Sequence, residues 1–428
     1  MAIDFAREVV LRWDDQDPAL APLLKEGAID VVLVREPLPV FRDACQAAGI
    51  RVAAASELKI VDLAGFRSAA PGTAALSEGL WPGIAGGHIR EDEELASPTR
   101  LPWVDANGFR YAWLRALAPG RTPVLAYLPN EAAGLKPSQI VPYDTLELAL
   151  VEAWISGGNY VMGVEPRYRA ALIAREVKAL TAWRNLGRTV RWLKQYRALF
   201  GRPALPQITL LVDEGEATAE IGNLMVRHNA APAIESAAAP PVPDPARRFV
   251  VVAVSLGDPA PAARKRILAH AEAGSILVVD RGEGEPWWRV PGLELEHDEP
   301  DRETYRLGHG RVVAYKKVIE DPSDFALDAI DLATHARRAA RTWFAPTVVV
   351  TATAGPEAGP VRGGEVVAAI NYGSPLHYEL MIYAQGNFSR ARLFRPEGEP
   401  VDVKIAKRGT RTEINLPDLR RVGVVVLG

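Results

Sequence analysis

The chain has 428 residues, which is too long for one ordinary hydrophobic core and favours two or three domains. Its 48% apolar and 24% charged residues are typical of a globular protein, and its formal net charge of −3 predicts no binding surface for nucleic acid or for an anionic membrane. One cysteine excludes a disulfide framework within the chain, and the seven histidines lack the spacing of a metal site.

The first 200 residues alternate short apolar runs with helical patterns. Residues 30–34 and 51–56 have the composition of strands, and a helix is predicted between them over 38–48. Pro39 falls in its first turn and Gly49 just past its end, which is a common asymmetry of helices. This βαβ arrangement predicts parallel strands.

The same alternation continues to about residue 205. In the helix predicted from "YDTLELALVEAWISGG", Asp144 is expected to cap the first turn while Glu147 reaches back, as in a capping box. The other elements expected here are strands at 8–13, 123–128 and 160–164, and a long helical stretch over 170–200. The pattern predicts a compact or incomplete (β/α) TIM-type barrel over residues 1–205, although residues 63–120 show no clear strands.

A second strand–helix alternation predicts a flavodoxin-like open α/β domain over residues 206–345. Its strands are expected at 207–213, 248–256, 275–280 and 310–317, and residues 235–248 are expected to form a loop. The first strand is followed by acids instead of a glycine-rich phosphate loop, so no cofactor is expected. The domain is therefore predicted to be structural, and it is a candidate surface for homo-oligomer formation.

From residue 346 the apolar pattern changes to period two. Seven short strands separated by turn residues predict an all-β sandwich over residues 346–428.

Acids recur directly after the predicted barrel strands, where a (β/α) barrel carries its chemistry. Glu165 follows the strand at 160–164, and Glu131 follows the preceding strand. Paired carboxylates in such places suit glycoside hydrolysis, so these two glutamates are the candidate catalytic pair. Two alternatives stay open, because strand-end acids are commonly solvated and because Glu165 could simply pair with Arg167 or Arg169.

Other side chains near the strand ends are candidate substrate-binding residues. Aromatic rings stack on the C–H face of a sugar, and amides and carboxylates bind its hydroxyl groups. The candidates are Asp14, Glu36, Glu57, Trp81, Trp103, Asp105, Asn107 and Asn130. Tyr111 and Trp113 are expected to lie on a helix that faces the core, and a structural role is an open alternative for Trp81 and Trp103.

The order of barrel, open α/β sheet and small β domain resembles the bacterial β-galactosidases of the clan-A glycoside hydrolases and their uncharacterised relatives. "LGHGRVVAYKKVIEDPSDFALDAI" is similar to the end of their middle domain, and "VVAAINYGSPLHYELMIYAQ" to "TEINLPDLRRVGVVVL" is similar to their terminal β domain. The family's acid/base is the Glu of an Asn–Glu pair after the fourth strand, and its nucleophile is a Glu after the seventh. Asn130 and Glu131 match that pair in type, whereas their place near the end of the strand series fits the nucleophile strand better.

Three functions follow as hypotheses. The chain hydrolyses a glycan through two carboxylates, or it is an inactive relative that binds a glycan or only assembles. The third hypothesis, a nucleotide-linked enzyme, lacks its phosphate loop. The expected partner is a carbohydrate, and no binding to nucleic acid or to a membrane is expected. No signal-peptide pattern is present, so the expected location is cytoplasmic, and a chain exported with its leader removed would look the same.

Overall fold

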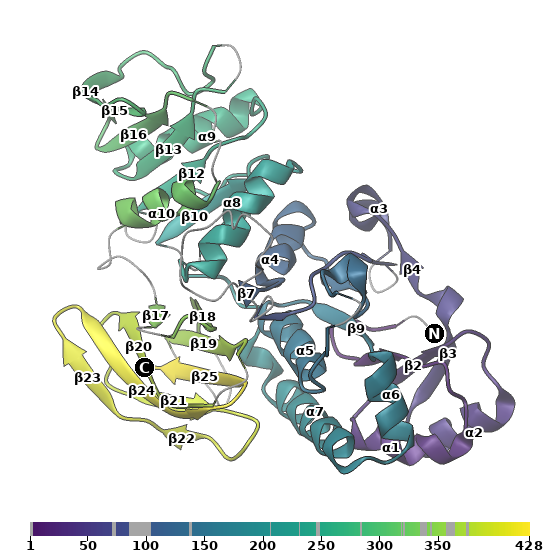
Figure 1. The fold of residues 1–428 in the computed structure, drawn as a ribbon. Coiled ribbons are helices and arrows are strands. Elements are labelled where there is room, and N and C mark those ends of the chain that lie inside the picture. The colour runs from purple at the N-terminus through teal and green to yellow at the C-terminus, as the bar shows by residue number, and fades with distance from the viewer. Residues whose placement is uncertain are drawn as a thin grey trace.

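The computed structural model describes residues 3–70, 74–84, 104–136, 139–205, 207–230, 232–244, 249–282, 285–317, 319, 322–333, 340–342, 345–356, 364–373 and 376–428. Three units follow one another along the chain, an N-terminal α/β unit, a middle α/β unit and a C-terminal pair of β-sheets (Figure 1). No helix in these ranges combines the length and the apolar composition needed to cross a membrane.

The N-terminal unit is built on a parallel sheet with the strand order β3-β2-β1-β9-β8. Its strands are β1 (Val10–Arg12), β2 (Val31–Val34), β3 (Arg51–Ala54), β8 (Val124–Leu125) and β9 (Asn159–Gly163). The predicted parallel βαβ unit is confirmed, and β8 pairs in parallel with β9. Leu76 bridges to Leu125 in parallel, directly after β5 (Ala74–Ala75), which pairs with β4 (Lys59–Ile60).

The two faces of this sheet have different neighbours. One face contributes to a single apolar cluster that draws on all five strands of this sheet and on β5, with the residues Val10, Val31, Leu33, Ala53, Ala75, Val124, Ala126 and Val161. Alternate residues such as Leu11, Val32 and Met162 point the other way and join the main core with the helices. In the described residues no ladder joins β3 to β4, so the strand order is that of an unclosed (β/α) arrangement.

The helices of this unit are α1 (Ala21–Glu26), α2 (Pro39–Ala47), α3 (Leu63–Ser68), α4 (Gly108–Leu117), α5 (Thr145–Ile155), α6 (Pro166–Ile173) and α7 (Val177–Gln195). Short 3-10 turns cover Pro18–Leu20, Ala55–Glu57, Glu131–Ala133 and Arg197–Leu199, and a two-residue ladder pairs β6 (Gly83–Ile84) with β7 (Val104–Asp105). The prediction for α2 is confirmed, since Pro39 opens it and Gly49 beyond its end has a φ of +82°.

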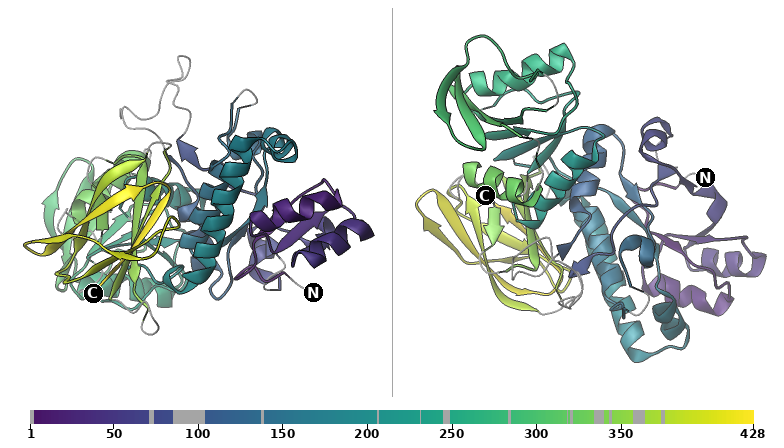
Figure 2. Two further views of the ribbon diagram at one scale, coloured as in Figure 1. Left: turned by 90° about the horizontal axis from the view of Figure 1, so that it is seen from below. Right: turned by 45° about the horizontal axis from the view of Figure 1, so that its top comes forward.

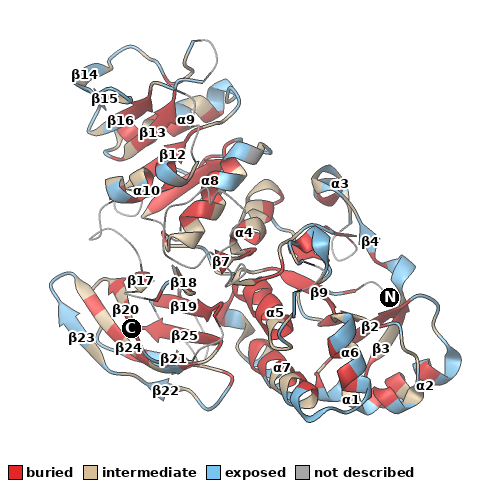
Figure 3. Ribbon diagram, in the orientation of Figure 1, coloured by how far each residue is buried: buried red, intermediate tan, exposed pale blue. Residues whose placement is uncertain are grey.

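Helix α5 is buried along its whole length after the first residue (Figure 3). The predicted capping box is wrong, because neither acid bonds the first turn of the helix. Asp144 accepts a hydrogen bond from Arg421, and Glu147 accepts from Thr189 and Arg420. The acids of α5 therefore serve contacts between distant parts of the chain.

The middle unit is an open sheet with the order β11-β10-β12-β13-β16-β15-β14. The strands are β10 (Ile208–Val212), β11 (Ala233–Ser236), β12 (Val250–Ala253), β13 (Ile276–Asp280), β14 (Glu294–Asp298), β15 (Arg302–Leu307) and β16 (Gly310–Tyr315). Helices α8 (Glu216–Arg227) and α10 (Pro322–Ala333) pack on one face, and α9 (Pro261–Glu272) packs on the other. The predicted two-sided α/β sheet is present, whereas the antiparallel edge of β14 and β15 and the strand β11 were not predicted.

The C-terminal unit consists of two antiparallel sheets, with the orders β17-β20-β24-β23 and β18-β19-β25-β21-β22, around a shared apolar core. Its strands are β17 (Ala340–Thr342), β18 (Val348–Ala354), β19 (Glu365–Asn371), β20 (His377–Gln385), β21 (Ala391–Phe394), β22 (Val401–Asp402), β23 (Ile405–Arg408), β24 (Arg411–Leu419) and β25 (Val422–Leu427). Strand β17 lies before the expected domain boundary at 346 and pairs with β20.

Helices α5 and α7 lie between the N-terminal sheet and the C-terminal sheets (Figures 1 and 2). Strand β19 is buried on both faces, since Val367 and Ala369 face the C-terminal core while Val366, Ala368 and Ile370 join the core around α5. This double burial explains its continuous apolar sequence.

Helix α4 makes the contact with the middle unit. The Phe109 ring belongs to the core of that unit, and Trp113 Nε1 donates to the Asp213 carbonyl at 2.9 Å. Tyr111 is fully buried on the same helix, as predicted, while Trp113 is half-buried between the two cores.

Candidate functional site

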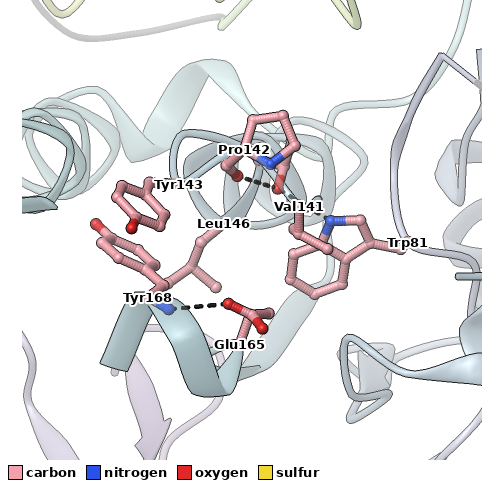
Figure 4. Close-up of a pocket in the computed structure, with 8 residues that line it drawn as sticks. Trp81, Val141, Pro142, Tyr143, Leu146, Glu165 and Tyr168 are labelled. Atoms are coloured by element: carbon pink, nitrogen blue, oxygen red, sulfur yellow. Dashed lines mark hydrogen bonds between the residues drawn. The ribbon is translucent and has the colours of Figure 1, made fainter. Parts of the chain in front are cut away.

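A pocket lies at the carboxyl ends of the parallel strands (Figure 4). Glu165 comes two residues after β9, and Trp81 follows the Leu76 bridge to β8. The 141–144 segment lies between β8 and α5, and Thr145 and Leu146 are the first residues of α5. The lining residues are Trp81, Val141, Pro142, Tyr143, Thr145, Leu146, Glu165 and Tyr168. Two residues predicted from the sequence, Trp81 and Glu165, thus meet in one place.

Aromatic rings form much of the pocket wall. Trp81 is buried, its Nε1 donates to Thr145 Oγ1 at 3.0 Å, and its ring meets Tyr127 edge to face. Tyr143 stacks on Tyr168 with ring centroids 4.4 Å apart (Figure 4). Burial raises the pKa of the Tyr168 hydroxyl, so this residue is neutral at physiological pH.

Glu165 caps helix α6 at the edge of the pocket. Its Oε2 accepts a hydrogen bond from the Tyr168 backbone N–H at 2.8 Å, and Pro166 fixes the backbone at the first helical position. The other carboxylate oxygen points away from that backbone (Figure 4). Among the described residues Glu165 forms no ion pair with Arg167 or Arg169, the alternative left open by the sequence, and Arg169 Nη1 donates instead to Asp14 Oδ2 at 3.0 Å.

The pocket is small. Its interior volume is about 10 Å³, which is room for roughly one water molecule. A sugar ring therefore has no room inside it and could contact the pocket residues only from the open side.

Glu131 and Asn130 lie at the same end of the sheet but not in the lining of this pocket. Both are exposed. Glu131 opens a 3-10 turn in which the Asn130 and Glu131 carbonyls accept hydrogen bonds from the backbone N–H groups of Ala133 and Gly134. The pairing of Glu131 with Glu165 around one substrate stays a prediction.

The remaining candidates from the strand ends are spread over the surface. Asp14, Glu36 and Glu57 are exposed, and Glu57 accepts a hydrogen bond from the Ala54 backbone N–H at 3.0 Å. Asp105 pairs with Arg227 of the middle unit at 3.3 Å. Their roles in substrate binding stay predictions, and Trp103 lies outside the described residues.

Asn107 is buried behind the pocket, where only 2% of its surface is exposed. Its side-chain amide accepts from the Leu80 backbone N–H and donates to the Leu80 carbonyl, both at 2.8 Å. It also donates to Glu152 Oε2 at 3.0 Å and to the Tyr127 hydroxyl at 3.3 Å. Asn107 therefore holds the residue next to Trp81, and its direct contact with a sugar stays a prediction.

Glu152 is a buried acid that the sequence reasoning missed. Its carboxylate accepts hydrogen bonds from the Asn107 side chain, the Asn107 and Gly108 backbone N–H groups and the Tyr372 hydroxyl. Burial raises its pKa, while these hydrogen bonds oppose the rise. A signal was present, because α5 has apolar residues on every side, and acids in such a helix need internal partners.

Tyr143 and Tyr168 do not directly follow a strand, so the strand-end pattern does not predict them. No group of three histidine, cysteine or acidic side chains that could hold a metal occurs in the described ranges.

Comparison with known proteins gives similarity in structure alone. No protein-family model matches the sequence, and no curated protein matches it. A β-galactosidase from Bacillus circulans sp. alkalophilus superposes with a TM-score of 0.51 at 12% identity, over 75% of this chain and 58% of that one. The α-L-fucosidase isoenzyme 2 from Paenibacillus thiaminolyticus gives a TM-score of 0.51 at 11% identity, over 91% of this chain and 70% of that one.

The fold resembles that of glycoside hydrolases. The resemblance noted from the sequence is thus confirmed at the level of fold. Because this chain spans 58% of the β-galactosidase chain, that enzyme's activity is not carried over with the fold.

Proposed function

We propose that this protein binds a carbohydrate, with a terminal sugar unit resting on the open side of the pocket formed by Trp81, Tyr143, Glu165 and Tyr168. The observation that carries the proposal is the gathering of three aromatic side chains and one carboxylate at the carboxyl ends of the strands. Aromatic faces pack against the C–H face of a sugar ring, and a carboxylate oxygen accepts from its hydroxyl groups. The likeness in fold to two glycoside hydrolases supports the same ligand class.

Binding is tested by ligand-observed NMR with galactosides and fucosides, using the wild type and two tyrosine variants. Tyr143→Ala should abolish saturation transfer to the bound sugar, because it removes one wall of the pocket. Tyr378→Ala is the matched control, since it removes an exposed tyrosine from β20. Equal signals from both variants would place any binding elsewhere and defeat the proposal.

A second candidate function is hydrolysis of the bound glycan by Glu131 and Glu165. It is favoured by the position of Glu165 in the pocket and by the direct pairing of β8 with β9, the strands that these two residues follow. Hydrolysis requires one carboxyl group to protonate the leaving oxygen while the other attacks the sugar or activates water.

Hydrolysis is tested with a panel of aryl glycosides. If the wild type turns over a glycoside, Glu131→Gln and Glu165→Gln should each lower the rate at least tenfold. A smaller loss in both variants would remove this pair, and no turnover by a chain that binds sugars would leave the binding function alone.

We also propose that the middle unit is structural, since its first strand is followed by acids in place of a phosphate loop, and that copies of the chain associate through it. Sedimentation that shows only a monomer at micromolar concentration would contradict the self-association.

A further inference from the structure

We infer that the C-terminal β-unit positions both walls of the sugar pocket, and that Tyr372 and Arg421 are the residues through which it does so. The inference rests on the proposed function. It concerns positioning residues, because neither side chain lines the pocket.

The first connection runs from Tyr372 to Trp81. The Tyr372 hydroxyl donates to Glu152 Oε1 at 2.6 Å, and Glu152 in turn accepts from the Asn107 side chain. Asn107 then bonds both backbone groups of Leu80, the residue that precedes Trp81. Every side chain in this series is at most 4% exposed, so water does not compete for the bonds.

The second connection runs from Arg421 to the opposite wall. Arg421 Nη1 donates to the Asn371 and Gly373 carbonyls, which flank Tyr372 in the chain. Arg421 Nη2 donates to Asp144 Oδ2 at 2.6 Å. Asp144 lies between Tyr143 and Thr145, and Thr145 Oγ1 is the acceptor for Trp81 Nε1.

The two connections start from one place in the C-terminal unit and end on the two sides of the pocket. The partners are more than 200 residues apart in sequence, with separations of 220 for Tyr372–Glu152 and 277 for Arg421–Asp144. Loss of the first contact removes one of the donors to the buried Glu152 carboxylate, and loss of the second removes the acceptor of Arg421 Nη2, so the adjacent pocket segment is then freer to shift.

The test uses the full chain labelled with 5-fluorotryptophan, and the Trp81 signal is assigned by its loss in Trp81→Phe. Tyr372→Phe removes one hydroxyl and keeps the ring in the core. We expect its ¹⁹F spectrum to show a shifted or broadened Trp81 signal, together with at least threefold weaker sugar binding. Asp144→Asn, which alters the exposed end of the second connection, should perturb the same signal.

The matched control is Tyr315→Phe, which removes another buried tyrosine hydroxyl, the donor to Asp328 Oδ2 in the middle unit. It should leave the Trp81 signal and the affinity unchanged even if it lowers the melting temperature. An unchanged Trp81 signal in both Tyr372→Phe and Asp144→Asn would overturn the inference. The ¹⁹F measurement needs no ligand. A wild type that binds no sugar would therefore contradict the proposed function, while the spectra of the variants would still test whether Tyr372 and Arg421 position the pocket.

Discussion

At the scale of single residues, the acids that matter most to the fold are buried ones. Glu147 and Glu152 are at most 1% exposed, and each accepts hydrogen bonds from other parts of the chain, on both oxygens of Glu152 and on Oε1 of Glu147. Burial of a carboxylate is costly unless donors replace the lost water, so these contacts are a condition of the fold.

Replacement of Glu152 by leucine should lower the free energy of unfolding by about 3 kcal/mol or more. The change leaves the Tyr372 hydroxyl and the Asn107 backbone N–H without their acceptor, and each buried unsatisfied donor costs roughly 1–3 kcal/mol. Urea titration measures the loss. Glu131→Leu on the exposed 3-10 turn is the control and should change stability by less than about 0.5 kcal/mol. Equal stability of the two variants would contradict the role of Glu152.

Glu365 predicts a dependence of stability on pH. It is buried on β19, where burial raises its pKa to about 8. The folded state then holds a proton that the unfolded chain releases near pH 4.5, so this stabilising effect is complete below pH 4.5 and is lost as pH rises through about 8.

Glu365→Gln should remove that dependence. Relative to the variant, the wild type should lose roughly 3 kcal/mol of unfolding free energy between pH 5 and pH 8, because one unit of pKa difference corresponds to about 1.4 kcal/mol. Chemical denaturation at several pH values measures both chains. Parallel pH profiles for the two chains would show that Glu365 is not the group responsible.

At the scale of elements, close packing fixes the position of helix α7 against helix α1. Helix α7 crosses the end of α1 at Gly187, where a Cβ atom would lie 1.9 Å from the Glu26 carbonyl oxygen. Gly187→Ala should therefore destabilise the protein, although glycine to alanine inside a helix ordinarily stabilises by roughly 1 kcal/mol. A melting temperature equal to or above that of the wild type would contradict this packing.

The elements also show what the sequence can predict. Strand and helix positions such as β2, α2 and β9 follow from local apolar runs and caps, which depend on near neighbours only. The two-residue strands β4 and β5 could not be found, because so short a segment carries no periodicity. In α5 the acids were assigned to a local capping box, whereas their true partners, Arg420 and Arg421, lie in a distant part of the chain.

The candidate site was likewise predictable only where local sequence determines the position of a residue. Residues that directly follow strands, such as Glu165, were found because barrel geometry gives them a place in advance. Tyr143 and Tyr168 come together only through the packing of the segment before α5 against α6, and no local pattern reports that contact.

At the scale of the whole molecule, the N-terminal and C-terminal units share one core. Residues of β19 and β25 join the apolar cluster that contains α5 and α7, and the Tyr196 ring meets Phe394 across the boundary at 5.0 Å. Polar contacts between α5 and the C-terminal unit fix the relative orientation of the two units. Because the units also share the apolar core, they should unfold together.

Arg420→Met should uncouple them in part. Arg420 pairs with the buried Glu147 and with Glu397, and Glu147 would then keep Thr189 as its remaining bonded partner in the described residues. Breaking an ion pair costs up to about 3–5 kcal/mol when both partners are buried, and less here because Arg420 is partly exposed. We expect faster hydrogen exchange in α5 and β25 together, with little change in the middle unit. Exchange that rises only next to residue 420 would contradict the shared core.

The proposal that the chain holds a sugar between Trp81 and Tyr143 is tested most directly by a crystal structure with a bound galactoside or fucoside. The structure should show one sugar ring packed against an aromatic face of the pocket, with a hydroxyl group within hydrogen-bond distance of Glu165. A sugar bound only at another surface, with the Trp81 pocket empty, would contradict the proposed function.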